Sequence, residues 1–200
     1  AVSGGGTYDY GKEVTIGATV KPGYTWKNWT GTSTLTSQSS KITVPASNVS
    51  YTANATLDTY SISYTLNGGS ATNPTTYTVE TADFTLNNPT RNYYTFAGWT
   101  GTGLSSATTT VKVAKGSTGN RSYTATWTPI SYSISYTLNG GSVSGNPTSY
   151  NVETPTFTLN NPTKVGYTFT GWTGTGLDDK TLSVTIAQGS TGDRSYTANW

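Results

Sequence analysis

The side chains that carry most enzymatic chemistry are missing from this sequence. It has no histidine, no cysteine and no methionine, and only 10% of its 200 residues are charged. Without histidine or cysteine, neither a Ser-His-Asp triad nor a thiolate nucleophile can form. The usual zinc, copper and iron sites need the same residues. The composition therefore predicts a protein that is not an enzyme and that holds no cofactor.

Acidic residues leave two further options for chemistry. Glu80 and Glu153 could act as a glycosidase acid/base pair, but they belong to different repeats (below), which separates them by about 30 Å. Asp178 and Asp179 with Asp193 could offer oxygen ligands to calcium, but they lack the spacing of an EF-hand. We expect a solvated loop there and predict no metal site.

Aromatic residues are the most tempting binding groups, because their faces stack on sugars and peptides. The chain has 6 tryptophans, 15 tyrosines and 4 phenylalanines. Aromatic residues that recur at one repeat position are expected in the core, since a buried large aromatic stabilises a small module by roughly 2–3 kcal/mol. The predicted core residues are Trp29, Trp99, Trp172, Trp127, Trp200, Tyr167, Phe169 and Phe96. Tyr93, Tyr94 and Trp26 depart from the repeat pattern and are the candidate binding residues.

The charge balance and the termini add little about partners. The net charge is +2, so no strong field attracts nucleic acid or an anionic membrane. No apolar run of about 18 residues predicts a membrane span. The sequence has no signal peptide and starts at Ala1 without methionine, so we interpret it as an excised piece of a longer protein.

Internal repeats organise the whole chain. The segment YSISYTLNGGS occurs at residues 60–70 and again at 132–142, and GWTGTGL at 98–104 returns at 171–177. A weaker copy at the front contains GYTWKNWTGT but lacks the YSISYTLN strand. We predict three modules, residues 1–58, 59–128 and 129–200, the first of them divergent and either complete or cut short. The joints between them are short, which favours an elongated array of nearly fixed direction.

Within a repeat, apolar residues alternate with polar ones. Tyr132, Ile134, Tyr136 and Leu138 alternate with serine and threonine, a pattern typical of a half-buried strand. Asn139 and two glycines follow with hairpin-type turn chemistry. No stretch has a sustained helical period. The sequence predicts a mainly β fold of small modules with little or no helix.

Charged residues that both close repeats share predict one structural contact. Glu80 corresponds to Glu153, and Arg121 corresponds to Arg194. We expect a Glu–Arg pair that joins two strands of the same repeat, with a modest contribution to stability at the surface.

Three motifs of the third repeat resemble a known family. They are Leu-Asn-Gly-Gly at 138–141, Pro-Thr-Lys-Val-Gly-Tyr-Thr-Phe-Thr-Gly-Trp at 162–172 and Tyr-Thr-Ala-Asn-Trp at 196–200. This pattern is similar to the Listeria–Bacteroides repeat, the internalin B B-repeat family. The second repeat matches except that Tyr93 replaces the glycine, and the first repeat is similar to a divergent form.

The resemblance implies a function without catalysis. The family's modules are small, β-grasp-like and tandem, and occur on secreted and cell-surface bacterial proteins, typically as stalks. It implies an extracellular structural spacer of an adhesin-like protein, with host or cell-surface glycan or protein contacted through the parent protein. The alternative is a glycan- or protein-binding adhesion module that uses exposed aromatics. We expect a monomer, with lateral assembly left open because the first repeat could expose a strand edge.

Overall fold

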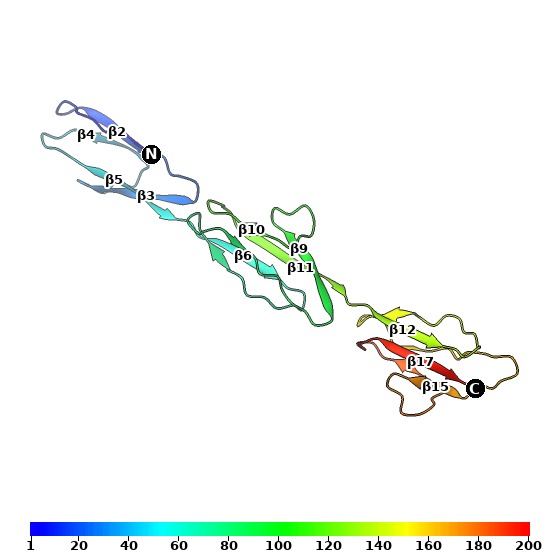
Figure 1. The fold of residues 1–200 in the computed structure, drawn as a ribbon. Coiled ribbons are helices and arrows are strands. Elements are labelled where there is room, and N and C mark those ends of the chain that lie inside the picture. The colour runs from blue at the N-terminus through cyan, green and yellow to red at the C-terminus, as the bar shows by residue number, and fades with distance from the viewer. The chain divides into compact units, whose positions relative to one another are not determined.

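The computed structural model describes residues 1–200 and consists of strands and turns (Figure 1). It contains no α-helix, so no helix is long and apolar enough to span a membrane. The strands form several small sheets, most of their pairings antiparallel. The mainly β class expected from the alternating pattern is confirmed. The β-grasp likeness and the elongated array stay predictions.

Contacts in space between backbone positions group the chain into two compact units. The first unit comprises Ala1–Asn67, Ala71–Asn88 and Trp99–Ala125, and the second comprises Gly68–Ser70, Pro89–Gly98 and Thr126–Trp200. The three-module division remains a prediction. Below, first, second and third repeat denote the sequence segments 1–58, 59–128 and 129–200.

The third repeat is built around a parallel pair of strands. Its strands are β12 (Tyr132–Thr137), β13 (Ser149–Tyr150), β14 (Phe157–Thr158), β15 (Gly171–Gly174), β16 (Thr185–Ile186) and β17 (Arg194–Asn199). One sheet has the order β13-β12-β17-β15, and β14 pairs with β16 in a second sheet. The opening strand β12 lies parallel to the closing strand β17 with Tyr136 opposite Tyr196. Figure 1 shows β12, β17 and β15 side by side.

The second repeat has the same topology. Its strands are β6 (Tyr60–Thr65), β7 (Thr76–Tyr77), β8 (Phe84–Thr85), β9 (Tyr94–Gly101), β10 (Lys112–Val113) and β11 (Arg121–Pro129). The sheet order is β7-β6-β11-β9, with β6 parallel to β11, and β8 pairs with β10. The identical YSISYT segments thus give identical opening strands. In both, the middle isoleucine is buried and the serines are exposed, as period-two alternation requires.

The first repeat keeps four of these strands and differs at its start. Its strands are β1 (Val2–Ser3), β2 (Glu13–Ala18), β3 (Tyr24–Gly31), β4 (Ser39–Thr43) and β5 (Tyr51–Leu57). One sheet has the order β1-β2-β4, and β3 pairs with β5 alone. No strand lies beside β5 in the place that β12 takes beside β17. This absence follows from the sequence, which has no YSISYTLN segment here.

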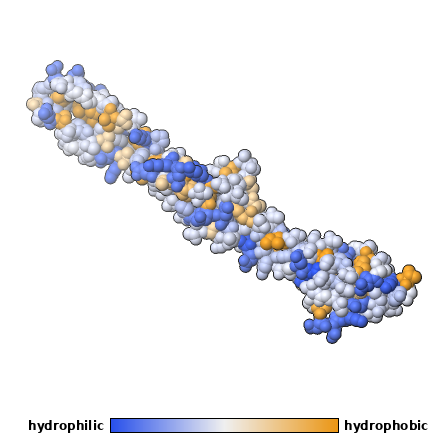
Figure 2. All heavy atoms as spheres, in the orientation of Figure 1, coloured by the Kyte–Doolittle hydropathy of each residue, from blue (hydrophilic) through white to orange (hydrophobic).

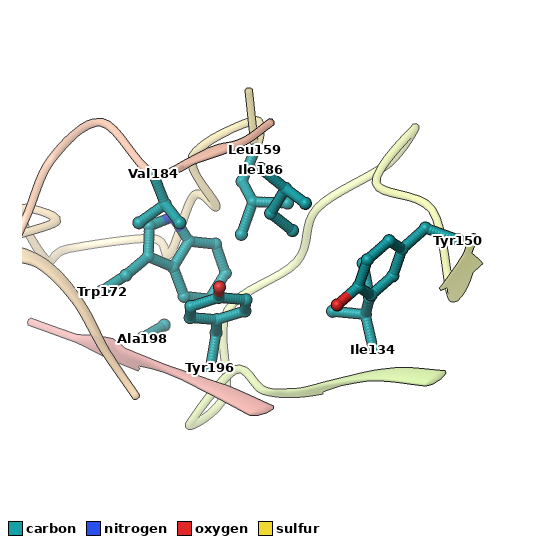
Figure 3. Close-up of a cluster of buried hydrophobic side chains, with 8 residues drawn as sticks. All are labelled: Ile134, Tyr150, Leu159, Trp172, Val184, Ile186, Tyr196 and Ala198. Atoms are coloured by element: carbon teal, nitrogen blue, oxygen red, sulfur yellow. The ribbon is translucent and has the colours of Figure 1, made fainter. Parts of the chain in front are cut away.

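The core of the third repeat is a cluster of eight buried residues from both sheets (Figure 3). Trp172 is fully buried and Tyr196 is 1% exposed. The close-up shows their rings next to each other, with Val184 over the indole and Ala198 below it. Tyr136 from β12 packs against both rings, with centroids 5.9 Å from Trp172 and 6.5 Å from Tyr196. The opening strand therefore closes the core.

Candidate functional site

The most distinctive contacts outside the cores lie where one repeat meets the next. The hydroxyl of Tyr24, in the first repeat, donates a hydrogen bond to Oε1 of Glu80 in the second. The hydroxyl of Tyr94, in the second repeat, donates to Oε1 of Glu153 in the third, over 2.9 Å. The two tyrosines hold one repeat position and the two glutamates another. The same contact therefore occurs twice, and each occurrence lies inside one compact unit.

A backbone hydrogen bond accompanies each tyrosine contact. The amide of Asp58 donates to the carbonyl of Gly23 over 2.9 Å, and the amide of Ile130 donates to the carbonyl of Tyr93 over the same distance. The threonine after Tyr24 adds a third bond, from its hydroxyl to Oδ1 of Asp58 over 2.6 Å. The short joints are thus hydrogen-bonded to the turn that precedes β3 or β9.

That turn requires a left-handed backbone. The φ angles are +82° at Gly23, +67° at Tyr93 and +78° at Gly166, a region that glycine enters without strain and other residues rarely enter. A Cβ on Gly23 would also lie 2.1 Å from a methyl of Val79. The valine beside Glu80 therefore packs directly on the turn of the preceding repeat.

The loop that carries each glutamate is held by its own hydrogen bonds. In the third repeat, Oδ1 of Asn151 accepts from the amides of Glu153 and Thr154 over 2.9 and 3.2 Å. In the second repeat, the hydroxyl of Thr78 accepts from the amide of Glu80 over 3.2 Å. Such side-chain turns are typical of asparagine and threonine. They present the carboxylate in a fixed direction.

Cations and carboxylates set the electrostatics of these tyrosines. The Arg91 guanidinium lies 3.6 Å from the ring centroid of Tyr94, within the range of a cation–π interaction. The hydrogen bonds to Glu80 and Glu153 raise the pKa of Tyr24 and of Tyr94, because ionised phenols could not donate them. Both tyrosines are therefore neutral donors at physiological pH.

The structure places the predicted core residues at three levels of burial. Trp29, Trp99 and Trp172 are at most 2% exposed. Trp127, Trp200, Phe96 and Phe169 are half-buried. Tyr167 was expected in the core and is 61% exposed, so that expectation is corrected. The reason is its position, because it is the third repeat's counterpart of Tyr24 and Tyr94, whose hydroxyls point to a following repeat.

The predicted binding aromatics do not gather into one patch. Tyr94 and Trp26 are half-buried and hydrogen-bonded, Trp26 through Nε1 to the carbonyl of Thr36 over 2.8 Å. Tyr93 is 50% exposed. On the face that Figure 2 shows, hydrophobic residues form small patches separated by neutral and hydrophilic ones.

The expected Glu–Arg pair is wrong in both repeats. Nε of Arg121 donates to the hydroxyl of Tyr77 over 3.0 Å, and Nε of Arg194 donates to that of Tyr150 over 2.8 Å. The ion pairs in the structure are Lys41–Glu13 and Lys112–Asp83. The glutamates point to the neighbouring repeat instead. Sequence comparison of repeats could not reveal this, because recurrence does not say which repeat a side chain contacts.

No group of three or more acidic residues gathers in a way that could hold a metal ion. Oδ1 of Asp193 accepts a hydrogen bond from the amide of Ser133 over 2.7 Å, which lowers the pKa of that carboxyl. Its counterpart Asn120 accepts the same bond from the amide of Ser61. The side chain at this position thus accepts a hydrogen bond from an amide near the start of the opening strand, and an asparagine accepts it as an aspartate does.

Comparison with known proteins identifies two kinds of repeat domain. The Listeria-Bacteroides repeat domain matches residues 60–124 and 132–194. The divergent InlB B-repeat domain matches residues 1–58. No curated protein and no solved structure matches.

Proposed function

The chain belongs to the Listeria-Bacteroides repeat family, and from this premise we propose that it is a structural spacer that carries tension in a bacterial surface protein. Domains of this family are typical of bacterial surface proteins, and repeat families of this kind are non-catalytic surface modules. The spacer projects another part of its parent protein away from the cell, outside the membrane. It performs no catalysis.

The parallel pairing of first and last strands carries this proposal. In the third repeat β12 opens the repeat and β17 closes it, and their residues pair from Ile134–Arg194 to Thr137–Thr197. The second repeat repeats this arrangement with β6 and β11. Tension on the two ends of such a repeat pulls parallel neighbours in opposite directions along their length. The ladder hydrogen bonds are then loaded together, in shear, rather than one after another.

The contacts at the joints support the same role. Each joint combines a backbone hydrogen bond with a tyrosine–glutamate hydrogen bond, at Tyr24–Glu80 and at Tyr94–Glu153. The joints are short in sequence, and these contacts further restrict their motion. Solvent-exposed hydrogen bonds of this kind are individually weak, because water competes for both partners, so the repeats supply most of the resistance.

Single-molecule force measurements on residues 1–200 test the proposal. We expect two high-force unfolding events, each lengthening the chain by roughly 200 Å, as about 70 residues at ~3.4 Å per residue imply once the folded length is subtracted. The first repeat, in which no parallel strand pairs with β5, should open at lower force.

The matched control changes only the direction of pulling. The chain has no cysteine, so Thr137→Cys and Thr197→Cys provide unique handles on paired residues of β12 and β17. Pulling there opens the ladder one hydrogen bond at a time, and we expect a several-fold lower force. Equal forces in both directions would contradict the shear arrangement, and low force along the chain would remove the spacer role.

Adhesion through exposed aromatics is the second candidate function. Tyr93, 50% exposed at the joint, is the observation that favours it. A glycan-array and host-matrix screen of residues 1–200 beside Tyr93→Ser tests it. Binding lost in the variant supports adhesion at this tyrosine, and binding that is absent from both proteins removes it.

A further inference from the structure

Two asparagine–glycine pairs hold the same position in the second and third repeats. Asn67-Gly68 follows β6 and Asn139-Gly140 follows β12, and no other asparagine of the chain precedes a glycine. The backbone at both asparagines is left-handed, with φ angles of +49° at Asn67 and +50° at Asn139. Asparagine tolerates this conformation better than most residues do. Each pair therefore forms the turn that ends an opening strand.

The side chain of each asparagine ties this turn to the closing strand. Nδ2 of Asn67 donates to the carbonyl of Ala125 in β11 over 2.9 Å. Nδ2 of Asn139 donates to the carbonyl of Ala198 in β17 over the same distance. Both acceptors belong to fully buried residues. The two hydrogen bonds therefore persist only while the opening strand stays beside the closing strand.

An asparagine–glycine pair has a chemistry of its own that needs no enzyme. Once the main-chain nitrogen of Gly140 has lost its proton to hydroxide, it can attack Cγ of Asn139, and glycine has no side chain to obstruct the approach. The new N–Cγ bond closes a succinimide ring while the Cγ–Nδ2 bond breaks, and Nδ2 leaves as ammonia after taking a proton from water. Water then opens the ring at either carbonyl and yields aspartate or isoaspartate. The net reaction consumes one water and exchanges the amide for a carboxyl group.

The folded repeat blocks this reaction at its first step. Attack requires Cγ of Asn139 to turn toward the following nitrogen, whereas the bond to Ala198 holds the side chain toward β17. The main chain at the turn is fixed as well, because the carbonyl of Leu138 accepts from the amide of Gly141 over 2.9 Å and from Nε1 of Trp200 over 3.1 Å. The hydrogen bond between the two strands must therefore break before the ring can close.

The product of the reaction cannot restore the lost contact. An ionised aspartate only accepts hydrogen bonds, so its oxygen and the carbonyl of Ala198 would face each other as two acceptors. A cation beside each pair favours the ionised form: Nζ of Lys164 lies 2.9 Å from the carbonyl oxygen of Asn139, and Arg91 lies beside Gly68. The isoaspartate product also lengthens the main chain by one carbon at the turn. A modified opening strand therefore pairs less firmly with the closing strand.

We propose that Asn67 and Asn139 are self-modifying sites, which deamidate when their opening strand leaves the closing strand. The substrate is the released Asn-Gly pair itself, and water is the co-reactant. Prolonged or repeated opening of a repeat thus leaves a lasting chemical mark and weakens the strand pairing afterwards. Denaturant releases the strand as tension does, so this reactivity is independent of the spacer role. The first repeat contains no Asn-Gly pair and acquires no such mark.

The first test compares the native chain with the chain unfolded in guanidinium chloride at the same mildly alkaline pH. Peptide mass spectrometry follows the conversion of each asparagine. In the unfolded chain Asn67 and Asn139 should convert at equal rates and ahead of every other asparagine, because the segments around them are identical. In the native chain we expect both to convert at least about tenfold more slowly, since only molecules with a released strand react. Equal rates in the two conditions, or no preference for these sites in the unfolded chain, would overturn the proposal.

Two matched substitutions test whether each site responds to its own strand. Ile62 in β6 and Ile134 in β12 are equivalent and buried. Ile134→Val removes a methyl group from the core of the third repeat and should speed the native conversion of Asn139 by about two- to tenfold, while Asn67 keeps its rate. Ile62→Val should do the reverse, and in guanidinium chloride neither substitution should matter. If both sites accelerate together, or neither responds, release of the opening strand does not control the reaction and the proposal is wrong.

Asn139→Asp isolates the effect of the product on strand pairing. This variant carries the modified side chain on an unaltered main chain. Amide hydrogen exchange in β12 should become at least about fivefold faster, because the hydrogen bond to Ala198 is lost, while β6 of the same molecule keeps its rate. Asn67→Asp is the matched control and should move the effect to β6. Unchanged exchange in both variants would contradict the weakening that we propose.

Discussion

The first and third repeats share four strands and differ in how their cores are closed. Strands β2, β3, β4 and β5 correspond to β14, β15, β16 and β17 in their pairings. In the third repeat β12, Asn161 and Trp200 complete the core. In the first, Ala18 and Ala55 replace the asparagine and the tryptophan, Nε1 of Trp29 is buried without a hydrogen-bond partner, and two hollows remain. The shared strands hold a scaffold without completing a core.

This difference separates burial of the central tryptophan from closure of the core around it. The central tryptophan is fully buried in the third repeat and 2% exposed in the first, so its burial requires only the shared strands. Satisfying its indole N–H requires one asparagine, and filling the space beside it requires the opening strand. The four shared strands therefore keep their pairings in residues 1–58, where no opening strand lies beside β5.

Removing the central tryptophan tests this separation with the largest expected effect. Trp172→Ala should lower the free energy of unfolding of the third repeat by about 3–5 kcal/mol, the range for a large aromatic in a packed core. Trp29→Ala should cost less, about 2 kcal/mol, because its ring already borders a hollow and its indole N–H lacks a partner. Amide hydrogen exchange resolved by repeat measures both, and equal losses would contradict the comparison.

Substitutions at the position that accepts the indole hydrogen bond should change the stability of the first and third repeats in opposite directions. Asn161→Ala leaves the N–H of Trp172 buried and unpaired, at a cost of about 1–3 kcal/mol. Ala18→Asn supplies the acceptor that Trp29 lacks and should stabilise the first repeat by about 1 kcal/mol. Urea unfolding gives both values, and the indole N–H resonance of Trp29 should shift. A destabilising Ala18→Asn would show that the indole is oriented elsewhere.

Alanine substitutions at the equivalent turn glycines Gly166 and Gly23 separate the cost of backbone strain from the cost of disturbing the contact with the next repeat. Gly166→Ala meets no atom within 4 Å, so it should cost only the left-handed backbone strain, about 1 kcal/mol. Gly23→Ala adds a clash with Val79 at 2.1 Å and should cost about 2 kcal/mol. It should also weaken the Tyr24–Glu80 bond, which NMR of the Tyr24 ring reports. Equal costs would mean that the contact with Val79 is not formed in solution.

The smallest expected effect is that of alkaline pH, which should lower the stability of the second and third repeats more than that of the first. Burial raises the pKa of Tyr64 and Tyr136 to about 12, above the ordinary value near 10. Their contribution to stability is complete below pH 10 and is lost as the pH rises toward 12, since the folded state favours the neutral phenol. The first repeat has no counterpart of these residues. Exchange measured between pH 9 and 12 checks this, and Tyr136→Phe should remove the dependence from the third repeat.

Repetition in the sequence determined which residues are equivalent, and period-two alternation determined that they form strands. These two signals were sufficient to predict the mainly β class and the core position of residues such as Trp29, Trp99 and Trp172, because burial of one face is a local property of a strand. They also showed that residues 1–58 contain no copy of the YSISYTLN segment.

Only the tertiary structure decided which partners the recurring polar residues contact. Glu80 and Arg121 recur in step, and the sequence alone favoured pairing them. The fold instead directs the glutamate to Tyr24 of the preceding repeat and the arginine to Tyr77 of its own. Tyr167 is exposed for the same reason, since its position points out of its own repeat. Alternation fixes the face of a strand on which a side chain lies, whereas contacts between distant residues depend on how the turns and joints fold.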